Sequence, residues 1–133
     1  MKHLILIRHG QSEWNQQKRF TGWVDVGLTD KGRAEAKKAG ELIKEKKIKL
    51  DSFYSSYQKR ANDTLKIIMK ELNEDENLIT RKWQLNERHY GELTGLNKED
   101  MKKKYGEEKI HQFRRSWDVK PGALDRKSPY HPL

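Results

Sequence analysis

The stretch LILIRHGQSEWN, residues 4–15, runs from consecutive apolar side chains directly into a polar cluster around one histidine. The apolar part, residues 3–7, is short and continuous and is soon followed by Gly10, a pattern typical of a strand covered on both faces. Strands of this kind occur in parallel sheets that helices enclose. The sequence therefore predicts a buried first strand that ends at Arg8 and His9.

The next segment with a clear period is helical. Residues 30–47 carry apolar or small side chains at helical spacing, and Thr29 stands where an N-cap is expected. We therefore expect a helix that begins after Thr29. Its small residues predict close packing against a sheet; they are Ala34, Ala36, Ala39 and Gly40.

A second strand and a second helix follow. Residues 51–55 predict the strand, and Ser56 is the expected N-cap of the helix. One apolar stripe marks that helix, formed by Ala61, Leu65, Ile68 and Leu72. Residues 73–77 predict a solvated turn, and residues 78–80 a short third strand.

The order strand, helix, strand, helix, strand predicts an α/β fold, a three-layer sandwich around a mostly parallel sheet with right-handed crossovers. Ligands of such sheets lie beyond the carboxyl ends of the strands, which is where His9 and Ser56 fall. Further along, residues 83–95 predict a polar-aromatic loop. Two helices are expected over residues 97–104 and 107–117, with a break at Tyr105 and Gly106.

Composition narrows the class of protein. The 133 residues suit one domain, 33% of them are hydrophobic and 37% charged, and the net charge of +9 favours anionic partners. Because the basic residues are spread along the chain, we expect small phosphorylated molecules rather than specific nucleic acid. There is no cysteine, no signal-peptide pattern and no membrane-spanning stretch, so we expect a cytoplasmic protein without a membrane partner.

His9 is the first candidate for chemistry. A lone histidine is more often a structural hydrogen-bonding residue than a catalyst. Here, however, it follows a strand, and its neighbours are Arg8, whose guanidinium can hold two phosphate oxygens, and Gly10, which allows a ligand to approach the backbone. A neutral imidazole is a competent nucleophile when its other nitrogen is held as a donor. His9 is therefore a candidate to accept a phosphoryl group.

Two further regions could serve the same chemistry. Arg60 is expected in the first turn of the second helix, beside exposed backbone N–H groups, although an ordinary surface arginine is the simpler interpretation. Glu87, Arg88 and Tyr90 form a loop that could bind an anion and move a proton, or simply a solvated turn with an ion pair. Three more cations either close over that anion or face solvent as ordinary helix charges; they are Lys98, Arg114 and Arg115.

Four stretches together resemble the cofactor-dependent phosphoglycerate mutases of the histidine phosphatase superfamily. They are LILIRHGQSEWN (4–15), RFTGWVDVGLT (19–29), Arg60-Ala61 and LNERHYGELTGLNK (85–98). The resemblance extends from Met1 to about Asp118. It implies the phosphoglycerate mutase-like fold and interconversion of 2-phosphoglycerate and 3-phosphoglycerate in glycolysis and gluconeogenesis. It also implies 2,3-bisphosphoglycerate as the primer, three-carbon phosphorylated acids as substrates and no metal.

The resemblance also implies roles for individual residues. His9 would be the phosphohistidine, Arg8 and Arg60 would clamp the phosphoryl group, and Glu87 would act as general acid and base. The pocket around the phosphoryl group would be lined by Ser12, Asn15, Thr21 and Gly22. The substrate carboxylate and second phosphate would be held by Arg88, Tyr90, Lys98, Arg114 and Arg115.

The sequence also departs from the family pattern. Neither His111 nor His131 is followed by glycine, so the second catalytic histidine of the family, in a His-Gly-Asn stretch, has no counterpart. We therefore expect residues 1–133 to form a partial domain, incomplete at the C-terminus, with greatly reduced or no mutase activity. Two alternatives are a histidine phosphatase that hydrolyses phosphate esters and a non-catalytic remnant. A second copy of the chain could cover the exposed strand edges.

Overall fold

The computed structural model describes residues 1–132, which fold into two compact units. The first unit contains Met1–Glu13 and Asp25–Asn86. The second contains Trp14–Val24 and the chain from Glu87 onward. Each unit has its own buried residues and is described separately.

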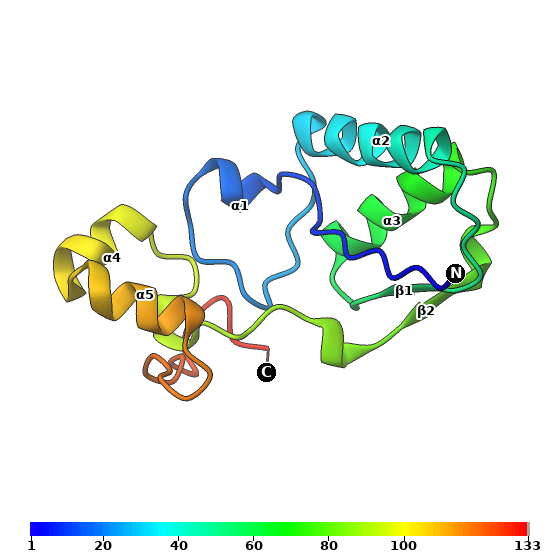
Figure 1. Ribbon diagram of the computed structural model, residues 1–133. Coiled ribbons are helices and arrows are strands. Elements are labelled where there is room, and N and C mark those ends of the chain that lie inside the picture. The colour runs from blue at the N-terminus through cyan, green and yellow to red at the C-terminus, as the bar shows by residue number, and fades with distance from the viewer. Residues whose placement is uncertain (133) are drawn as a thin grey trace. The chain divides into compact units, whose positions relative to one another are not determined.

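The first unit joins two helices to a small parallel sheet (Figure 1). Its helices are α2 (Asp30–Glu45) and α3 (Lys59–Glu71), and its strands are β1 (Phe53–Ser55) and β2 (Ile79–Arg81). The strands pair in parallel, with Phe53 opposite Ile79, and α3 forms the crossover between them. Short 3-10 turns lie at η1 (Glu76–Leu78) and η2 (Trp83–Leu85). The predicted α/β class is confirmed.

Helix α2 begins where its sequence predicts. The Thr29 side chain accepts a hydrogen bond from the backbone N–H of Gly32, which confirms the N-cap. Gly40 is buried, but the neighbour it approaches closely is α3 rather than the sheet: a Cβ at Gly40 would lie 2.8 Å from the Cβ of Glu71 and 3.2 Å from the Cα of Ile68. At Gly40 the expected contact with a sheet is therefore wrong, and the small residue serves a helix–helix contact instead. Ala34 is exposed.

Helix α3 begins later than predicted. Its N-cap is Gln58, not Ser56, because the Ser56 hydroxyl accepts from the backbone N–H of Gln58 in a turn before the helix. Of the predicted apolar stripe only Ile68 is buried. The adjacent Met69 is fully buried and packs with Phe53 and Ile79 beneath the sheet.

The predicted first strand is wrong. Residues 1–11 have no regular secondary structure, and the side chains of Leu4 and Leu6 are each 84% exposed. A strand exists only where a neighbouring strand completes its backbone hydrogen bonds. Within residues 1–132, β1 and β2 pair with each other, and residues 3–7 belong to no ladder. Apolar composition alone therefore did not produce a strand.

The second unit is built from short helices. They are α1 (Glu13–Gln16), whose first residue belongs to the first unit, the 3-10 turn η3 (Gly91–Leu93), α4 (Lys98–Tyr105) and α5 (Glu107–Arg115). Gly106 separates α4 from α5 with a φ of +86°, which confirms the predicted break at this residue, whereas Tyr105 still belongs to α4. The buried cluster of this unit comprises Phe20, Tyr90, Leu93, Ile110 and Phe113. None of the helices described over residues 1–132 is long and apolar enough to cross a membrane.

Candidate functional site

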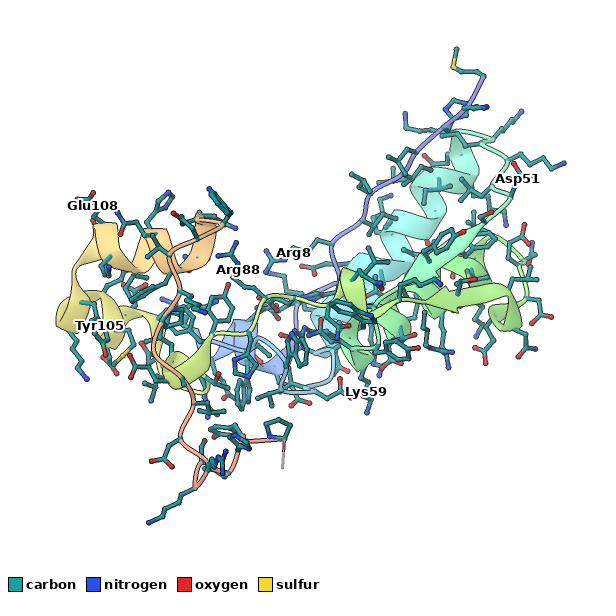
Figure 2. The ribbon with its side chains drawn as sticks, turned by 90° about the horizontal axis from the view of Figure 1, so that it is seen from below. Arg8, Asp51, Lys59, Arg88, Tyr105 and Glu108 are labelled. Atoms are coloured by element: carbon teal, nitrogen blue, oxygen red, sulfur yellow. The ribbon has the colours of Figure 1, made fainter. Side chains whose placement is uncertain are left out.

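The ring of His9 is held by the backbone next to it. Its Nδ1 lies 2.7 Å from the carbonyl oxygen of Gly10. Because a carbonyl oxygen can only accept, this contact favours a proton on Nδ1, which in the neutral ring leaves the lone pair on Nε2. Arg8, labelled in Figure 2, precedes it with an exposed side chain. The contact with Gly10 thus favours the tautomer that a nitrogen nucleophile requires.

Gly10 holds this turn against both helices of the first unit. Its backbone N–H donates to the Thr64 hydroxyl on α3 at 3.1 Å. A Cβ at Gly10 would lie 2.1 Å from the carbonyl oxygen of Gly32 in the first turn of α2. The glycine was expected to make room for a ligand. The structure shows a different reason, since the space a side chain would occupy is filled by the backbone of α2.

The residues after Gly10 are fastened to the start of α2. The backbone N–H of Gln11 donates to the Glu35 carboxylate at 2.8 Å, and its carbonyl accepts from the backbone N–H of Thr29 at 3.0 Å. Ser12 is fully buried and forms an isolated bridge with Leu28. The segment that carries His9 is thus anchored although it is not a strand.

Arg60 lies in the first turn of α3 and is 0% exposed, so its interpretation as a surface arginine is wrong. Its carbonyl oxygen accepts from the Thr64 hydroxyl at 2.8 Å, and the same hydroxyl accepts from Gly10. One threonine therefore joins the turn of His9 to the turn of Arg60. Thr64 was not among the predicted residues, although a threonine four residues after a helical arginine is placed to bond its carbonyl.

The second unit gathers charges around Tyr90. Burial raises the pKa of the Tyr90 phenol, and the Glu87 carboxylate raises it further, whereas Arg114, Arg88 and Arg115 lower it. These opposed effects on one phenol mean that a carboxylate and three guanidinium groups lie near it. The structure therefore brings together five of the predicted residues.

Arg88 also has a structural role that its sequence position did not reveal. Its Nη1 donates to the carbonyl oxygens of Phe113 at 3.0 Å and Ser116 at 2.8 Å, at the end of α5. A cation at a helix C-terminus satisfies carbonyls that have no partner within the helix. Figure 2 labels this side chain. The contacts show that Arg88 stabilises the end of α5. That Arg88 also holds an anion stays a prediction.

The other predicted residues of the second unit are Asn15, Thr21, Gly22 and Lys98, of which Gly22 approaches the same loop closely. Gly22 has a φ of +57°, and a Cβ there would lie 3.0 Å from the carbonyl oxygen of Arg88. Trp23, which was not among the predicted site residues, donates from Nε1 to the carbonyl oxygen of Glu87 at 2.7 Å. The Lys98 ammonium lies 5.8 Å from the centre of the Phe20 ring. Thr21 is buried and Asn15 is partly buried.

The predicted residues therefore fall into two sets. Arg8, His9, Ser12 and Arg60 belong to the first unit. The second unit holds Asn15, Thr21, Gly22, Glu87, Arg88, Tyr90, Lys98, Arg114 and Arg115.

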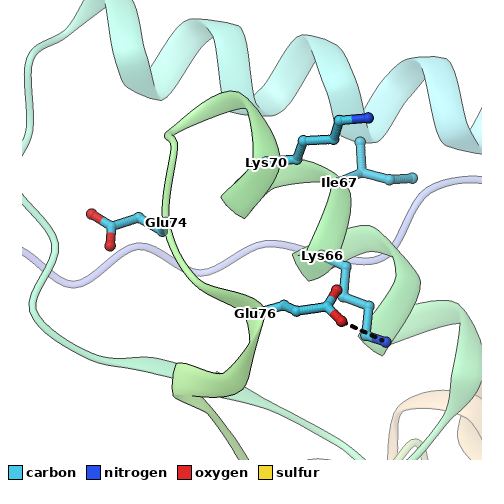
Figure 3. A pocket seen from close by; sticks show the side chains of 5 residues that line it. All are labelled: Lys66, Ile67, Lys70, Glu74 and Glu76. Carbon is cyan, nitrogen blue, oxygen red and sulfur yellow. Dashed lines mark ion pairs between the residues drawn. The ribbon is translucent and has the colours of Figure 1, made fainter.

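A separate hollow of about 330 Å³ lies beside α3 and involves none of these residues (Figure 3). It is lined by Lys66, Ile67, Lys70, Glu74 and Glu76. The Lys66 ammonium and the Glu76 carboxylate form an ion pair at 3.8 Å across it. Its charges neutralise one another locally, so we assign it no part in the site.

Comparison with known proteins gives a consistent result. The sequence pattern of the histidine phosphatase superfamily (branch 1) matches residues 4–129. A 2,3-bisphosphoglycerate-dependent phosphoglycerate mutase of Pelagibacter ubique is 66% identical over 133 residues, which are 100% of this chain and 56% of that protein. A protein of the same name from Bacteroides fragilis is 49% identical over 132 residues, 99% of this chain and 53% of its own. The chain thus spans about half the length of these relatives.

Solved structures agree on the fold. The Bacillus stearothermophilus protein YhfR superposes with a TM-score of 0.66 at 28% identity, over 80% of this chain and 50% of its own. A phosphoserine phosphatase from Entamoeba histolytica, solved in complex with 3-phosphoglyceric acid, gives 0.64 at 25% identity, over 86% and 53%. Each superposition covers most of this chain and about half of the solved structure.

Proposed function

Because this chain belongs to the histidine phosphatase superfamily, we propose that it serves the interconversion of 2-phosphoglycerate and 3-phosphoglycerate through a phosphohistidine at His9. The bond from His9 Nδ1 to the Gly10 carbonyl is the observation that carries this proposal, since it leaves the lone pair on Nε2. The relatives that are 66% and 49% identical to this chain are named as phosphoglycerate mutases, which supports the proposal. The proposal places the reaction in glycolysis and gluconeogenesis in the cytoplasm.

In the proposed reaction, Nε2 of His9 attacks phosphorus, an N–P bond forms and the P–O bond to glycerate breaks. Glu87 donates a proton to the leaving oxygen and takes one from the hydroxyl that later attacks the phosphohistidine. A phosphoryl transition state carries negative charge on its outer oxygens, which Arg8 and Arg60 would stabilise. Ser12, Asn15, Thr21 and Gly22 would line the phosphoryl pocket.

The substrate carboxylate and its second phosphate would be held by Arg88, Tyr90, Lys98, Arg114 and Arg115. The three guanidinium groups near the Tyr90 phenol support this assignment, because planar guanidinium groups suit carboxylate and phosphate oxygens. The same donors fit 2,3-bisphosphoglycerate, which also carries a carboxylate and phosphates. That compound, when bound, supplies the phosphoryl group that primes His9.

Labelling of His9 tests the proposal directly. We expect the protein to take up acid-labile phosphate from radiolabelled 2,3-bisphosphoglycerate, and His9→Gln to take up none. His3→Gln is the matched control, because His3 lies in the same irregular segment and is exposed. Equal labelling of wild type and H9Q, or no labelling of wild type, contradicts the proposal.

Hydrolysis of phosphate esters is the second candidate, because a solved neighbour is named as a phosphoserine phosphatase. Release of inorganic phosphate from varied esters, without isomerisation that depends on bisphosphoglycerate, would favour it. A protein that never acquires phosphate on His9 would instead be a non-catalytic member.

Two further proposals concern the polypeptide by itself. We expect the polypeptide of residues 1–133 to have greatly reduced or no mutase activity, because none of its histidines corresponds to the second catalytic histidine that the family resemblance implies. A coupled assay that gives turnover comparable to the longer relatives would contradict this. We also propose that the exposed apolar run, Leu4–Ile7, mediates association with a second copy of the chain.

A further inference from the structure

Thr64 uses its hydroxyl twice. The side chain is 4% exposed and lies in α3, four residues after Arg60. Its Oγ1 donates to the Arg60 carbonyl oxygen at 2.8 Å and accepts from the Gly10 N–H at 3.1 Å. A hydroxyl has a single proton, so the donated bond orients the lone pairs that receive Gly10.

Only the first of these bonds is explained by the helix. Threonine in a helix commonly donates to the carbonyl four residues earlier, wherever it stands in the protein. The second bond joins residues 54 positions apart in the sequence. It ties Thr64 to the turn that carries His9.

Gly10 transmits this contact to the imidazole. The carbonyl of Gly10 accepts from His9 Nδ1, while its N–H donates to Thr64. Packing of Gly10 against the Gly32 carbonyl limits where its Cα can lie. The bond from the Gly10 N–H to Thr64 restrains the orientation of the Gly10 backbone. The Gly10 carbonyl therefore stays directed at the His9 ring.

We propose that Thr64 is a positioning residue for His9, and that its hydroxyl holds Gly10 so that the imidazole keeps its proton on Nδ1 and its lone pair on Nε2. This rests on the proposed role of His9 as the phosphoryl acceptor. The Thr64 hydroxyl bonds the backbone of Gly10 and of Arg60. It acts through the Gly10 peptide.

Two variants separate the hydroxyl from the shape of the side chain. Thr64→Val keeps the branched shape and removes both hydrogen bonds, whereas Thr64→Ser keeps the hydroxyl and removes a methyl group. Thr80→Val is the matched control, because Thr80 is exposed on β2. Thr64→Ala, which favours the helix, replaces T64V should that variant not fold.

The first readout is the initial rate of His9 labelling at saturating 2,3-bisphosphoglycerate. We expect T64V to label roughly tenfold or more slowly, since small misplacements of a reacting group have large effects on rate. T64S and T80V should label at rates close to wild type. The half-saturating concentration should change less than the rate.

The second readout is the ¹⁵N chemical shifts of the His9 imidazole, which report the tautomer without any substrate. We expect the shifts of wild type and T64S to show a protonated Nδ1, and those of T64V to show a mixture of tautomers. Wild-type shifts in T64V, or slow labelling in T64S as well as T64V, would overturn the inference. Failure of wild type to label would refute the proposed function instead, while the shifts would still decide the role of Thr64.

Discussion

Position 10 requires glycine because of the atoms that surround it, and not because of its own backbone angles. It has no positive φ, yet a Cβ would meet the Gly32 carbonyl oxygen at 2.1 Å and the Gly32 Cα at 2.8 Å. The obstructing atoms are backbone atoms in the first turn of α2, so no rotamer change relieves the contact. Any larger residue must move either the helix or the turn that carries His9.

We therefore expect Gly10→Ala to lower the free energy of unfolding by about 1–3 kcal/mol, the usual effect of overpacking. It should also slow phosphate uptake by His9. Urea denaturation measures the stability. Gly27→Ala is the control, because a Cβ there would meet only a carboxylate oxygen of Glu13, at 3.5 Å. Equal stability of the two variants would show that the turn is not packed as described.

Tyr90 gives stability a dependence on alkaline pH. Burial, followed by the Glu87 carboxylate, raises the pKa of its phenol above the ordinary value of 10.0. A raised folded-state pKa means that the folded state holds the proton more tightly than the unfolded state. Its contribution to stability is complete below pH 10 and is lost as the pH rises through the folded-state pKa.

We therefore expect the free energy of unfolding to fall between pH 10 and the raised pKa, and Tyr90→Phe to show a smaller fall. Tyr54→Phe is the control, because Tyr54 is exposed on β1. Denaturation at a series of alkaline pH values measures both. Parallel pH profiles for wild type and Y90F would contradict the assignment.

Helix α4 depends on its N-cap as well as on packing. None of its residues is fully buried, although Met101 and Tyr105 are partly buried and pack against the core cluster of the second unit. Asn97 caps it, and its Oδ1 accepts from the backbone N–H groups of Glu99 at 2.9 Å and Asp100 at 3.2 Å. Lys98, a proposed substrate residue, is the first residue of this helix.

Removal of this cap should have a measurable effect. We expect Asn97→Ala to lower the free energy of unfolding by about 1 kcal/mol, and Asn97→Asp to retain the wild-type value. Chemical denaturation followed by circular dichroism measures this. Lys103→Ala, an exposed change within the same helix, is the control. Equal stability of N97A and K103A would mean that the cap contributes nothing.

The elements that the sequence predicted correctly are those whose causes are local. Thr29 before a helical period and Gly106 between two helices act through their own backbone neighbourhood, and both were found as expected. The prediction of a strand at residues 3–7 was wrong because a strand needs hydrogen-bonding partners from elsewhere in the chain. Composition cannot supply those partners.

The sequence named the residues of the candidate site, whose roles stay predictions, but it did not reveal the contacts that hold them. Arg60 was expected in the first turn of its helix. Its complete burial could not be inferred, because the apolar stripe of that helix predicted burial at other positions. Thr64 and Trp23 act through bonds to residues 54 and 64 positions away. Nothing in a local pattern indicates such partners.

At the scale of the whole molecule, the first unit exposes an apolar surface that no other part of the described chain covers. Leu4 and Leu6 are almost as exposed as in an extended chain, and Ile7 and Tyr54 are also exposed. A run of exposed apolar residues with unpaired backbone groups is suited to pairing with another chain. The net charge of +9 opposes that pairing between identical copies.

Salt screens the charge repulsion between copies but does not weaken the apolar contact. Self-association can therefore be tested by varying the salt concentration. We expect the average mass of the protein to rise with concentration, and to rise more at high salt, because screening weakens the repulsion and leaves the apolar contact. The double variant Leu4→Lys with Leu6→Lys should stay monomeric, with an unchanged free energy of unfolding because both side chains are exposed. Leu42→Lys, at an exposed position on α2, is the control and should associate as wild type does. Light scattering over a range of concentrations measures the mass, and a monomeric wild type at high concentration and high salt would refute association through this run.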